Sequence, residues 1–162
     1  MVNDSGIVAN NAKNANVINN FVKLSGNTKN GIELTGCDSS TVSCNTVSGR
    51  YPAMGYQNKG VNISHSTTNF LNCNNTDSTY YGNYFDGACT GTKFKGAKMN
   101  RHFEGLRLYT NAVIDTQSHG GNLWYGPFTT GGYGANNLNS STVFALQQSL
   151  FLIDYSYGGA YL

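Results

Sequence analysis

The chain has 162 residues, of which 11% are charged, and a formal net charge of +2 at pH 7. This length fits one domain with its own core, and the low charge without a basic run excludes the electrostatic footprint of a nucleic-acid or anionic-membrane binder. No apolar segment approaches the ~20 residues that cross a bilayer, so we expect no membrane insertion. Abundant glycine, asparagine, serine and threonine indicate a surface made soluble by amides and hydroxyls.

The two ends of the sequence lack the features of a complete secreted chain. The opening stretch VNDSGIV has neither the charged nor the apolar region of a signal peptide, and the sequence stops at SYGGAYL without a polar tail. We therefore expect a segment of a longer polypeptide or a fragmentary gene model.

A repeat begins at three glycines, Gly6, Gly31 and Gly60, which are 25 and 29 residues apart. Each precedes an alternating stretch, IVA, IEL or VNI, and equivalent residues recur eleven, fourteen and sixteen positions later. The recurring positions are the apolar Val17, Val42 and Leu71, the amides Asn20, Asn45 and Asn74, and the β-branched Val22, Val47 and Thr76. Such self-similarity is typical of solenoids.

Each repeat is predicted to contain a strand, a loop, a second strand, a bend and a third strand. The alternation after each glycine is the period of a strand with one buried face, and we expect the repeated asparagine to turn the chain through the left-handed region, which asparagine tolerates. Short strands bury a face only when repeats stack. Stacking also explains the composition, because asparagines in adjacent coils can hydrogen-bond in ladders whereas stacked charges repel.

The pattern continues more weakly toward the C-terminus. Phe94 and Met99 keep the spacing of the apolar positions, with Ala97 in place of the asparagine. A new repeat starts at Gly105, where Ile114 and Gln117 reproduce the apolar-x-x-amide step after a two-residue deletion.

The "G-I-x-L … V-x-x-N-x-V" coils between Gly6 and Thr76 resemble the right-handed parallel β-helix proteins, the pectate-lyase-like superfamily, and especially repeat proteins of secreted bacterial type. The resemblance implies an all-β fold, a right-handed parallel β-helix (solenoid) of about five coils, located outside the cell or at its surface. It specifies the fold rather than the function, because the superfamily includes lyases, hydrolases, esterases, tailspikes and adhesins. We expect coils over residues 1–122 and an irregular, aromatic-rich cap over residues 123–162 of the same domain.

The aromatic residues that follow the last recognisable coil have two interpretations. Trp124, Tyr125 and Phe128 are candidates for ligand binding, since aromatic rings stack on the apolar faces of sugars. The alternative is a cap in which these rings pack against the apolar run 143–153 and cover the open end of the solenoid.

The spacing of the cysteines predicts free thiols rather than a disulfide. Cys44 and Cys73 both lie thirteen residues after their glycine, so we expect them to stack as free, buried thiols, because parallel side chains rarely meet the dihedral of a disulfide. Cys37 and Cys89 are at other positions, and the histidines are scattered. We expect no metal site and no cofactor.

Candidates for catalysis are few. Asn75-Thr76-Asp77 resembles the first motif of polygalacturonases, and the stretch SHGG around His119 resembles their histidine motif, but the expected Asp-Asp pair and Arg-x-Lys are missing. Asp77, Asp115, His119 and Arg107 are the catalytic candidates. Arg107 belongs with Glu33 and Asn62 to a polar stripe that we interpret as a solvated strand face.

The sequence favours a structural or adhesive, glycan-binding segment of an extracellular bacterial surface protein, which presents many weak contacts on a rigid rod. The alternative is a fragment of a carbohydrate-active enzyme, a polysaccharide lyase or glycoside hydrolase. The expected partners are a polysaccharide or cell-surface glycan, and further copies of the chain through end-to-end or lateral association.

Overall fold

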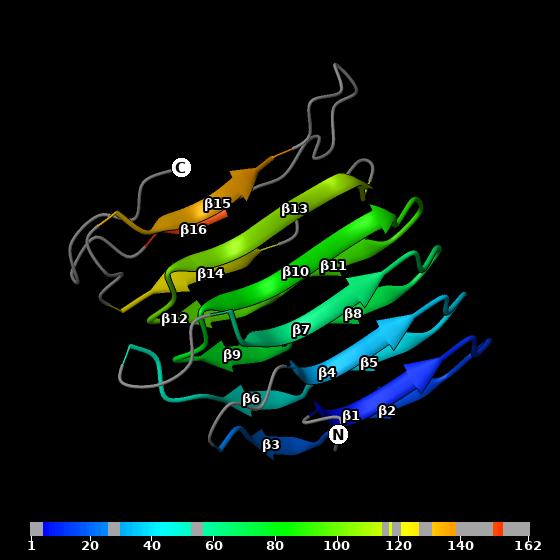
Figure 1. Ribbon diagram of the computed structural model, residues 1–162, viewed down its shortest axis with the longest axis horizontal. Coiled ribbons are helices and arrows are strands. Elements are labelled where there is room, and N and C mark those ends of the chain that lie inside the picture. The colour runs from blue at the N-terminus through cyan, green and yellow to red at the C-terminus, as the bar shows by residue number, and fades with distance from the viewer. Residues whose placement is uncertain are drawn as a thin grey trace.

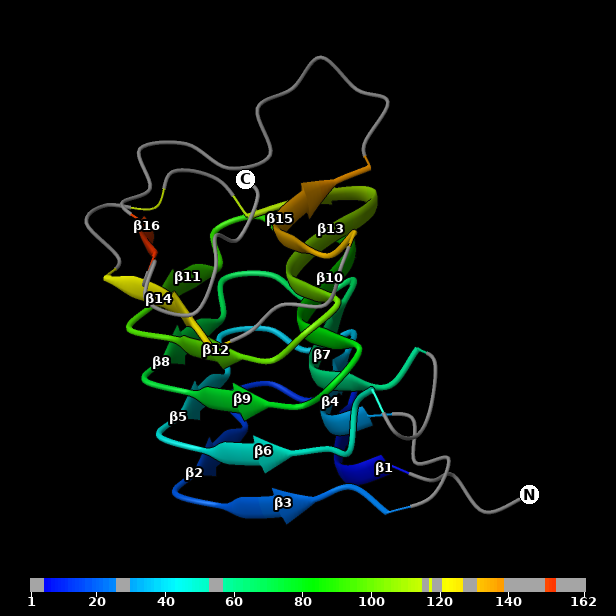
Figure 2. The same cartoon turned by 90° about the vertical axis from the view of Figure 1, so that its left-hand side faces the viewer.

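The computed structural model describes residues 5–25, 30–52, 57–114, 117, 121–126, 131–138 and 151–153. Within these ranges the chain forms strands and no helix, and the strands stack into three parallel sheets (Figure 1). Each complete coil contributes one strand to each sheet, and Figure 2 shows the coils stacked from β1–β3 at one end to β14–β16 at the other. The predicted parallel β-solenoid of about five coils is confirmed.

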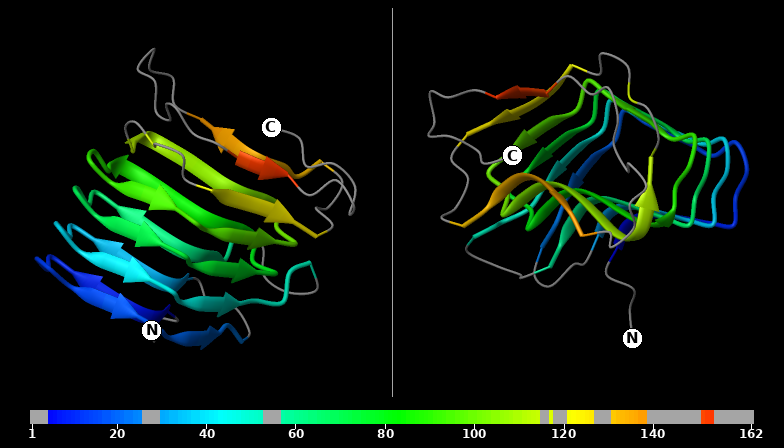
Figure 3. Two further views of the ribbon diagram at one scale, coloured as in Figure 1. Left: turned by 180° about the vertical axis from the view of Figure 1, so that it is seen from behind. Right: turned by 90° about the horizontal axis from the view of Figure 1, so that it is seen from above.

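The sheets are defined by the following strands. Sheet 1 contains β1 (Ser5–Asn10), β4 (Asn30–Thr35), β7 (Lys59–Ser64), β10 (Tyr81–Ala88), β13 (Glu104–Val113) and β15 (Tyr133–Asn137). Sheet 2 contains β2 (Asn16–Ile18), β5 (Thr41–Ser43), β8 (Phe70–Asn72) and β11 (Lys93–Lys95). Sheet 3 contains β3 (Phe21–Lys23), β6 (Thr46–Ser48), β9 (Asn75–Asp77), β12 (Lys98–Asn100), β14 (Asn122–Tyr125) and β16 (Phe151–Ile153). Seen from above, successive coils follow the same path (Figure 3).

The core consists of columns of apolar side chains that run through the stack. The predicted column Val17, Val42 and Leu71 is confirmed on sheet 2, where Phe94 extends it. A second column on sheet 3 contains Val22, Val47, Thr76, Met99 and Trp124. All of these side chains are buried, so the fixed spacing in the sequence reflects register in the core.

The repeat glycines are required by close packing between sheets 1 and 3. A Cβ on Gly31 would collide with the Val47 side chain and would lie 2.6 Å from the carbonyl oxygen of Gly60 in the next coil. Gly82 occupies the same position in its own coil, where an added Cβ would lie 2.5 Å from the carbonyl oxygen of Gly105. Gly82 therefore starts a coil that the sequence pattern did not reveal.

The predicted asparagine ladder is confirmed. Asn45 Nδ2 donates to Val17 O at 2.8 Å and to Asn74 Oδ1 at 3.0 Å, while its Oδ1 accepts from Asn20 Nδ2 at 3.0 Å. The ladder is interrupted at Ala97 and resumes with Asn122, whose Oδ1 accepts from Ala97 N at 3.0 Å. The prediction that Gln117 takes this step is wrong, because Asn122 is the residue in register with Ala97.

The prediction that these asparagines adopt the left-handed conformation is wrong, because the preceding residue does. Cys44 and Cys73 both have a φ of 54°. The reversal at that residue turns the asparagine inward, where its side-chain amide binds two backbone groups of the preceding coil, as Asn45 does with Val17 O and Asn20 N.

Replacing Asn45 by leucine is expected to lower the free energy of unfolding by about 1–3 kcal/mol, because buried backbone groups lose their partners. Urea denaturation measures this effect. The control is Asn16→Leu at an exposed position of β2, which should change stability little. Equal stability of the Asn45 variant and the native protein would contradict the structural role of the ladder.

Candidate functional site

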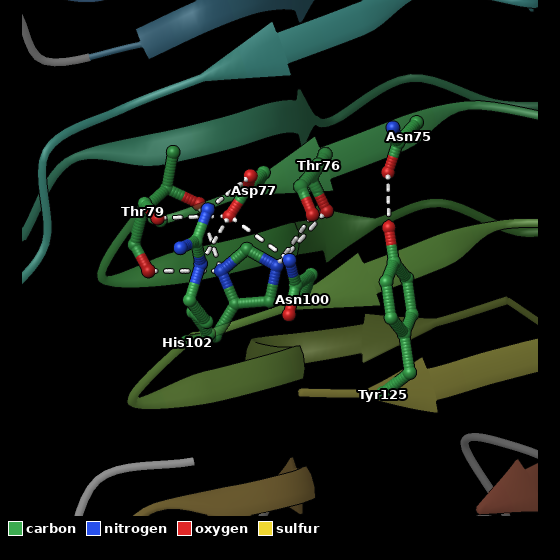
Figure 4. Close-up of polar contacts among 9 residues, drawn as sticks. Asn75, Thr76, Asp77, Thr79, Asn100, His102 and Tyr125 are labelled. Carbon is green, nitrogen blue, oxygen red and sulfur yellow. Dashed lines mark hydrogen bonds and ion pairs between the residues drawn. The ribbon is translucent and has the colours of Figure 1, made fainter. Parts of the chain in front are cut away.

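The polygalacturonase-like tripeptide places Asp77 at the end of β9, in the cluster shown in Figure 4. Arg101 binds both carboxylate oxygens, with Nε 3.0 Å from Oδ1 and Nη2 2.6 Å from Oδ2. Ser78 Oγ and Asn100 Nδ2 also donate to Oδ1, at 2.8 and 3.3 Å. Burial raises the pKa of Asp77, but the hydrogen bonds from Arg101 and Ser78 outweigh it, so the pKa is lowered. Asp77 is therefore an ionised, fully engaged carboxylate, which suits a structural ion pair better than proton transfer.

His102 lies beside this cluster and is completely buried. Its Nδ1 is 2.9 Å from Thr79 O and its Nε2 is 3.0 Å from Thr76 O. Burial lowers the pKa of His102 to about 4 despite these carbonyls. The ring fills the space left by Gly82, where a Cβ would be 2.9 Å from Nε2. His102 thus acts as a neutral core residue.

Among the other sequence candidates that the structure describes, Tyr125 borders this cluster, whereas Trp124 and Arg107 lie elsewhere in the fold. Trp124 is completely buried in the sheet 3 column, and its ring occupies the space beside Gly105. Tyr125 is partly exposed, and its hydroxyl lies 3.4 Å from Asn75 Oδ1 (Figure 4). Asp115, His119, Phe128 and most of the apolar run lie outside the described residues. In the part of the chain that the structure describes, no three His, Cys, Asp or Glu side chains gather as metal ligands.

Arg107 belongs to a larger arrangement on the outer side of sheet 1, which we call the tyrosine face. The strand register aligns equivalent positions of successive coils. The residues one position before, two after and four after each repeat glycine therefore form three columns of outward-facing side chains. The C-terminal half of these columns is rich in tyrosine. The tyrosine face comprises Lys59, Asn62, Tyr81, Tyr84, Asp86, Glu104, Arg107, Tyr109, Tyr133 and Asn136.

Arg107 is held at the centre of the tyrosine face. Its Nη1 donates to Glu104 Oε1 at 3.0 Å and to the hydroxyl of Tyr81 at 3.0 Å. Its Cζ lies 4.8 Å from the ring centroid of Tyr81 and 5.3 Å from that of Tyr109. Asn136 Nδ2 also donates to Glu104 Oε1 at 3.0 Å. These contacts fix the guanidinium plane and the neighbouring rings in place.

The stripe of Glu33, Asn62 and Arg107 therefore differs from the solvated face that the sequence analysis expected. Tyr84 lies between Asn62 and Arg107 in the register, and only 7% of it is exposed. The ammonium of Lys59 covers the Tyr84 ring at 3.7 Å from its centroid. Burial lowers the pKa of Lys59 and raises the pKa of Tyr84. The face is thus a packed surface of aromatic and polar groups.

Two rings of the tyrosine face remain accessible. Tyr109 is 40% exposed and Tyr133 is 44% exposed. Tyr133 pairs with Glu104, five residues before Tyr109, so the two rings are about 16 Å apart along the strand direction. Amide and guanidinium groups of Asn136 and Arg107 lie between these positions. The arrangement offers two aromatic contacts with hydrogen-bonding groups between them.

Sequence reasoning missed this face because the coil that begins at Gly82 was not recognised. The sequence does contain the repeat spacing at this coil. Tyr84 follows Gly82 by two residues, and Arg107 follows Gly105 by the same two residues. Asn83 interrupts the apolar alternation that identified the other coils, although it is buried in the same column as Val61 and Leu106.

Comparison of the sequence and the structure with protein-family models, curated proteins and solved structures gives no match. Among the described residues, no helix has the length and apolar character to span a membrane.

Proposed function

We propose that the protein is a carbohydrate-binding β-solenoid, a structural or adhesive segment of an extracellular bacterial surface protein, and that the tyrosine face binds the glycan. The observation that carries the proposal is the pair of exposed rings, Tyr109 and Tyr133, on one rigid parallel sheet. Sugar rings present apolar faces and hydroxyl edges, which match aromatic rings flanking amide and guanidinium groups.

The charge of the tyrosine face favours a neutral glycan. Lys59 and Arg107 are its cations, and both are compensated by carboxylates. Glu33 and Asp86 act on Lys59, and Glu104 pairs with Arg107 in a bridge whose side chains are 15% and 3% exposed. An acidic polysaccharide would bring its charge next to three carboxylates, which is unfavourable.

The enzyme alternative finds less support in the geometry. Hydrolysis of a glycoside uses two carboxyl groups in separate roles, with one pKa raised so that it acts as the acid. Burial raises the pKa of Asp77, but the hydrogen bonds from Arg101 and Ser78 outweigh it, so the pKa of this carboxyl is lowered instead. We therefore propose binding without a chemical step.

Alanine substitution of Tyr109 or Tyr133 is expected to weaken binding of neutral oligosaccharides about tenfold, or roughly 1–2 kcal/mol, because central aromatic contacts dominate interface energies. A glycan array identifies the ligand, and titration calorimetry gives the affinities. Both variants should keep the native melting temperature, since these rings are substantially exposed.

The matched control is Phe21→Ala, which removes a 71% exposed ring from sheet 3. It should leave binding unchanged. Retained affinity in both tyrosine variants would overturn the assignment of the face. Tighter binding of oligogalacturonate or alginate than of neutral glycans would overturn the neutral ligand class, and product formation from any of them would support the enzyme alternative instead.

A further inference from the structure

Two exposed cysteines lie in adjacent coils at the bend between sheets 2 and 3. Cys44 N donates to Asn72 O at 2.9 Å and Cys73 N donates to Lys95 O at 3.0 Å. Ser43 pairs with Asn72, and Thr46 pairs with Asn75, so Cys44 and Cys73 occupy the same position of successive coils. Both thiols are free. The expectation that they are buried is wrong, because the left-handed bend turns these side chains outward.

The fold does not require cysteine at this position. The same column holds Asn19, Gly96 and Gly121, with φ values of 57°, 62° and 57°. Asparagine and glycine tolerate the left-handed region, whereas another side chain there costs about 1 kcal/mol. Two neighbouring coils thus carry thiols where the backbone favours other residues.

The repeat distance of the solenoid sets the separation of these side chains. Neighbouring strands are about 4.8 Å apart, and two residues with the same φ in adjacent coils are nearly translated copies. Their Cβ atoms are then about 4.8 Å apart, beyond the roughly 3.5–4.5 Å of a disulfide. Cys73 Sγ lies 3.3 Å from where a Cβ on Gly96 would be, so the thiol points toward the next coil and has to rotate about χ1 to face Cys44. In that rotamer the two sulfurs are about one repeat apart, which is close to the span of about 4.6 Å of a linear sulfur–metal–sulfur unit whose bonds are about as long as a zinc–thiolate bond.

We propose that Cys44 and Cys73 form a two-coordinate thiolate site for a soft monovalent metal ion of the Cu(I) and Ag(I) class. On binding, each thiol releases its proton to solvent and each Sγ forms one bond to the ion, without electron transfer. Soft thiolates select such ions. The resulting unit carries one negative charge, and the exposed Lys95 and Lys98 flank the same bend in the next coil.

The coordination number follows from the surroundings. Zinc in structural sites takes four ligands, whereas the described residues hold no cluster of three or more His, Cys, Asp or Glu. The nearest polar contact of Cys73 Sγ is the Asn72 Oδ1 atom at 3.2 Å, a hard oxygen that does not compete for a soft ion. The site therefore suits an ion that is stable with two sulfur ligands.

Titration of the reduced chain with Ag(I) in chloride-free buffer tests the proposal, with native mass spectrometry as the readout. We expect one Ag(I) per chain, loss of both thiols that react with an aromatic disulfide reagent in the folded protein, and two sulfur neighbours at one distance in X-ray absorption. Cys44→Asn and Cys73→Asn copy the residue at Asn19, so they should keep or raise the melting temperature. Each should weaken Ag(I) binding about 100-fold, because a chelate becomes a single ligand.

Two results would overturn the site. One is native Ag(I) affinity in either single variant, or two Ag(I) ions per native chain, because the thiols then act independently. The other is formation of a Cys44–Cys73 disulfide by oxidised glutathione at unchanged melting temperature, because the sulfurs then approach more closely than the repeat distance allows.

Discussion

Replacing Trp124 by alanine is expected to lower the free energy of unfolding by about 3–5 kcal/mol, because a fully buried indole leaves a cavity that the rigid stack cannot close. In the sheet register Trp124 pairs with Met99 of the coil below and with Ile153 of the strand above. It also occupies the space that a side chain at Gly105 would need. Urea denaturation followed by circular dichroism measures the change.

Phe21→Ala is the control for loss of an aromatic ring, and it should change stability by less than about 0.5 kcal/mol because Phe21 is an exposed residue. Trp124→Phe serves if the alanine variant does not fold, and it should be intermediate. In the native protein the single tryptophan should resist quenching by acrylamide and should not respond to oligosaccharide. A normally folded Trp124→Ala protein that has lost sugar binding would reinstate Trp124 as a ligand platform.

Acidification should destabilise the protein by about 3 kcal/mol between pH 6.5 and pH 4 through His102 alone, at about 1.4 kcal/mol per pKa unit. The ordinary histidine pKa is 6.5, and burial lowers that of His102 to about 4. Within this window the unfolded chain binds a proton that the folded chain does not, so stability falls with falling pH. Above pH 6.5 both states are neutral at this residue and its contribution is constant.

The variant His102→Gln isolates this effect, because it removes the titrating ring and retains an amide for Thr76 O and Thr79 O. We expect it to be less stable than the native protein at pH 7.5, and its free energy of unfolding should change less between pH 6.5 and 4. Denaturation in urea at several pH values gives both profiles. Parallel profiles for the two proteins would falsify the assignment.

The fold was predictable where the pattern is local. Gly31, Val42, Asn45 and Val47 recur at fixed distances along the sequence because each must meet its copy in the adjacent coil, so the stack could be inferred without the structure. The left-handed residue was misplaced by one position, since asparagine occupies both Asn19 and Asn20 and tolerates either role. The outward direction of Cys44 depends on that single position.

The tyrosine face was not predictable in the same way. Its residues come from coils of unequal length, so neighbours such as Tyr84 and Arg107 are visible only after every coil is aligned. The role of His102 was hidden for a similar reason, because its ring fills a space defined by Gly82 in a coil that the pattern did not reveal.

The parallel stacking of all three sheets makes the molecule mechanically anisotropic. Hydrogen bonds between coils run along the axis of the stack, and the strands of each coil pair only with those of the adjacent coils. A force applied along the axis loads one interface at a time, so coils would separate singly from an end. A force applied along the strands loads the bonds of many coils in shear at once. The solenoid should therefore withstand a larger force when a bound ligand pulls along the strands than when the two ends of the stack are pulled apart.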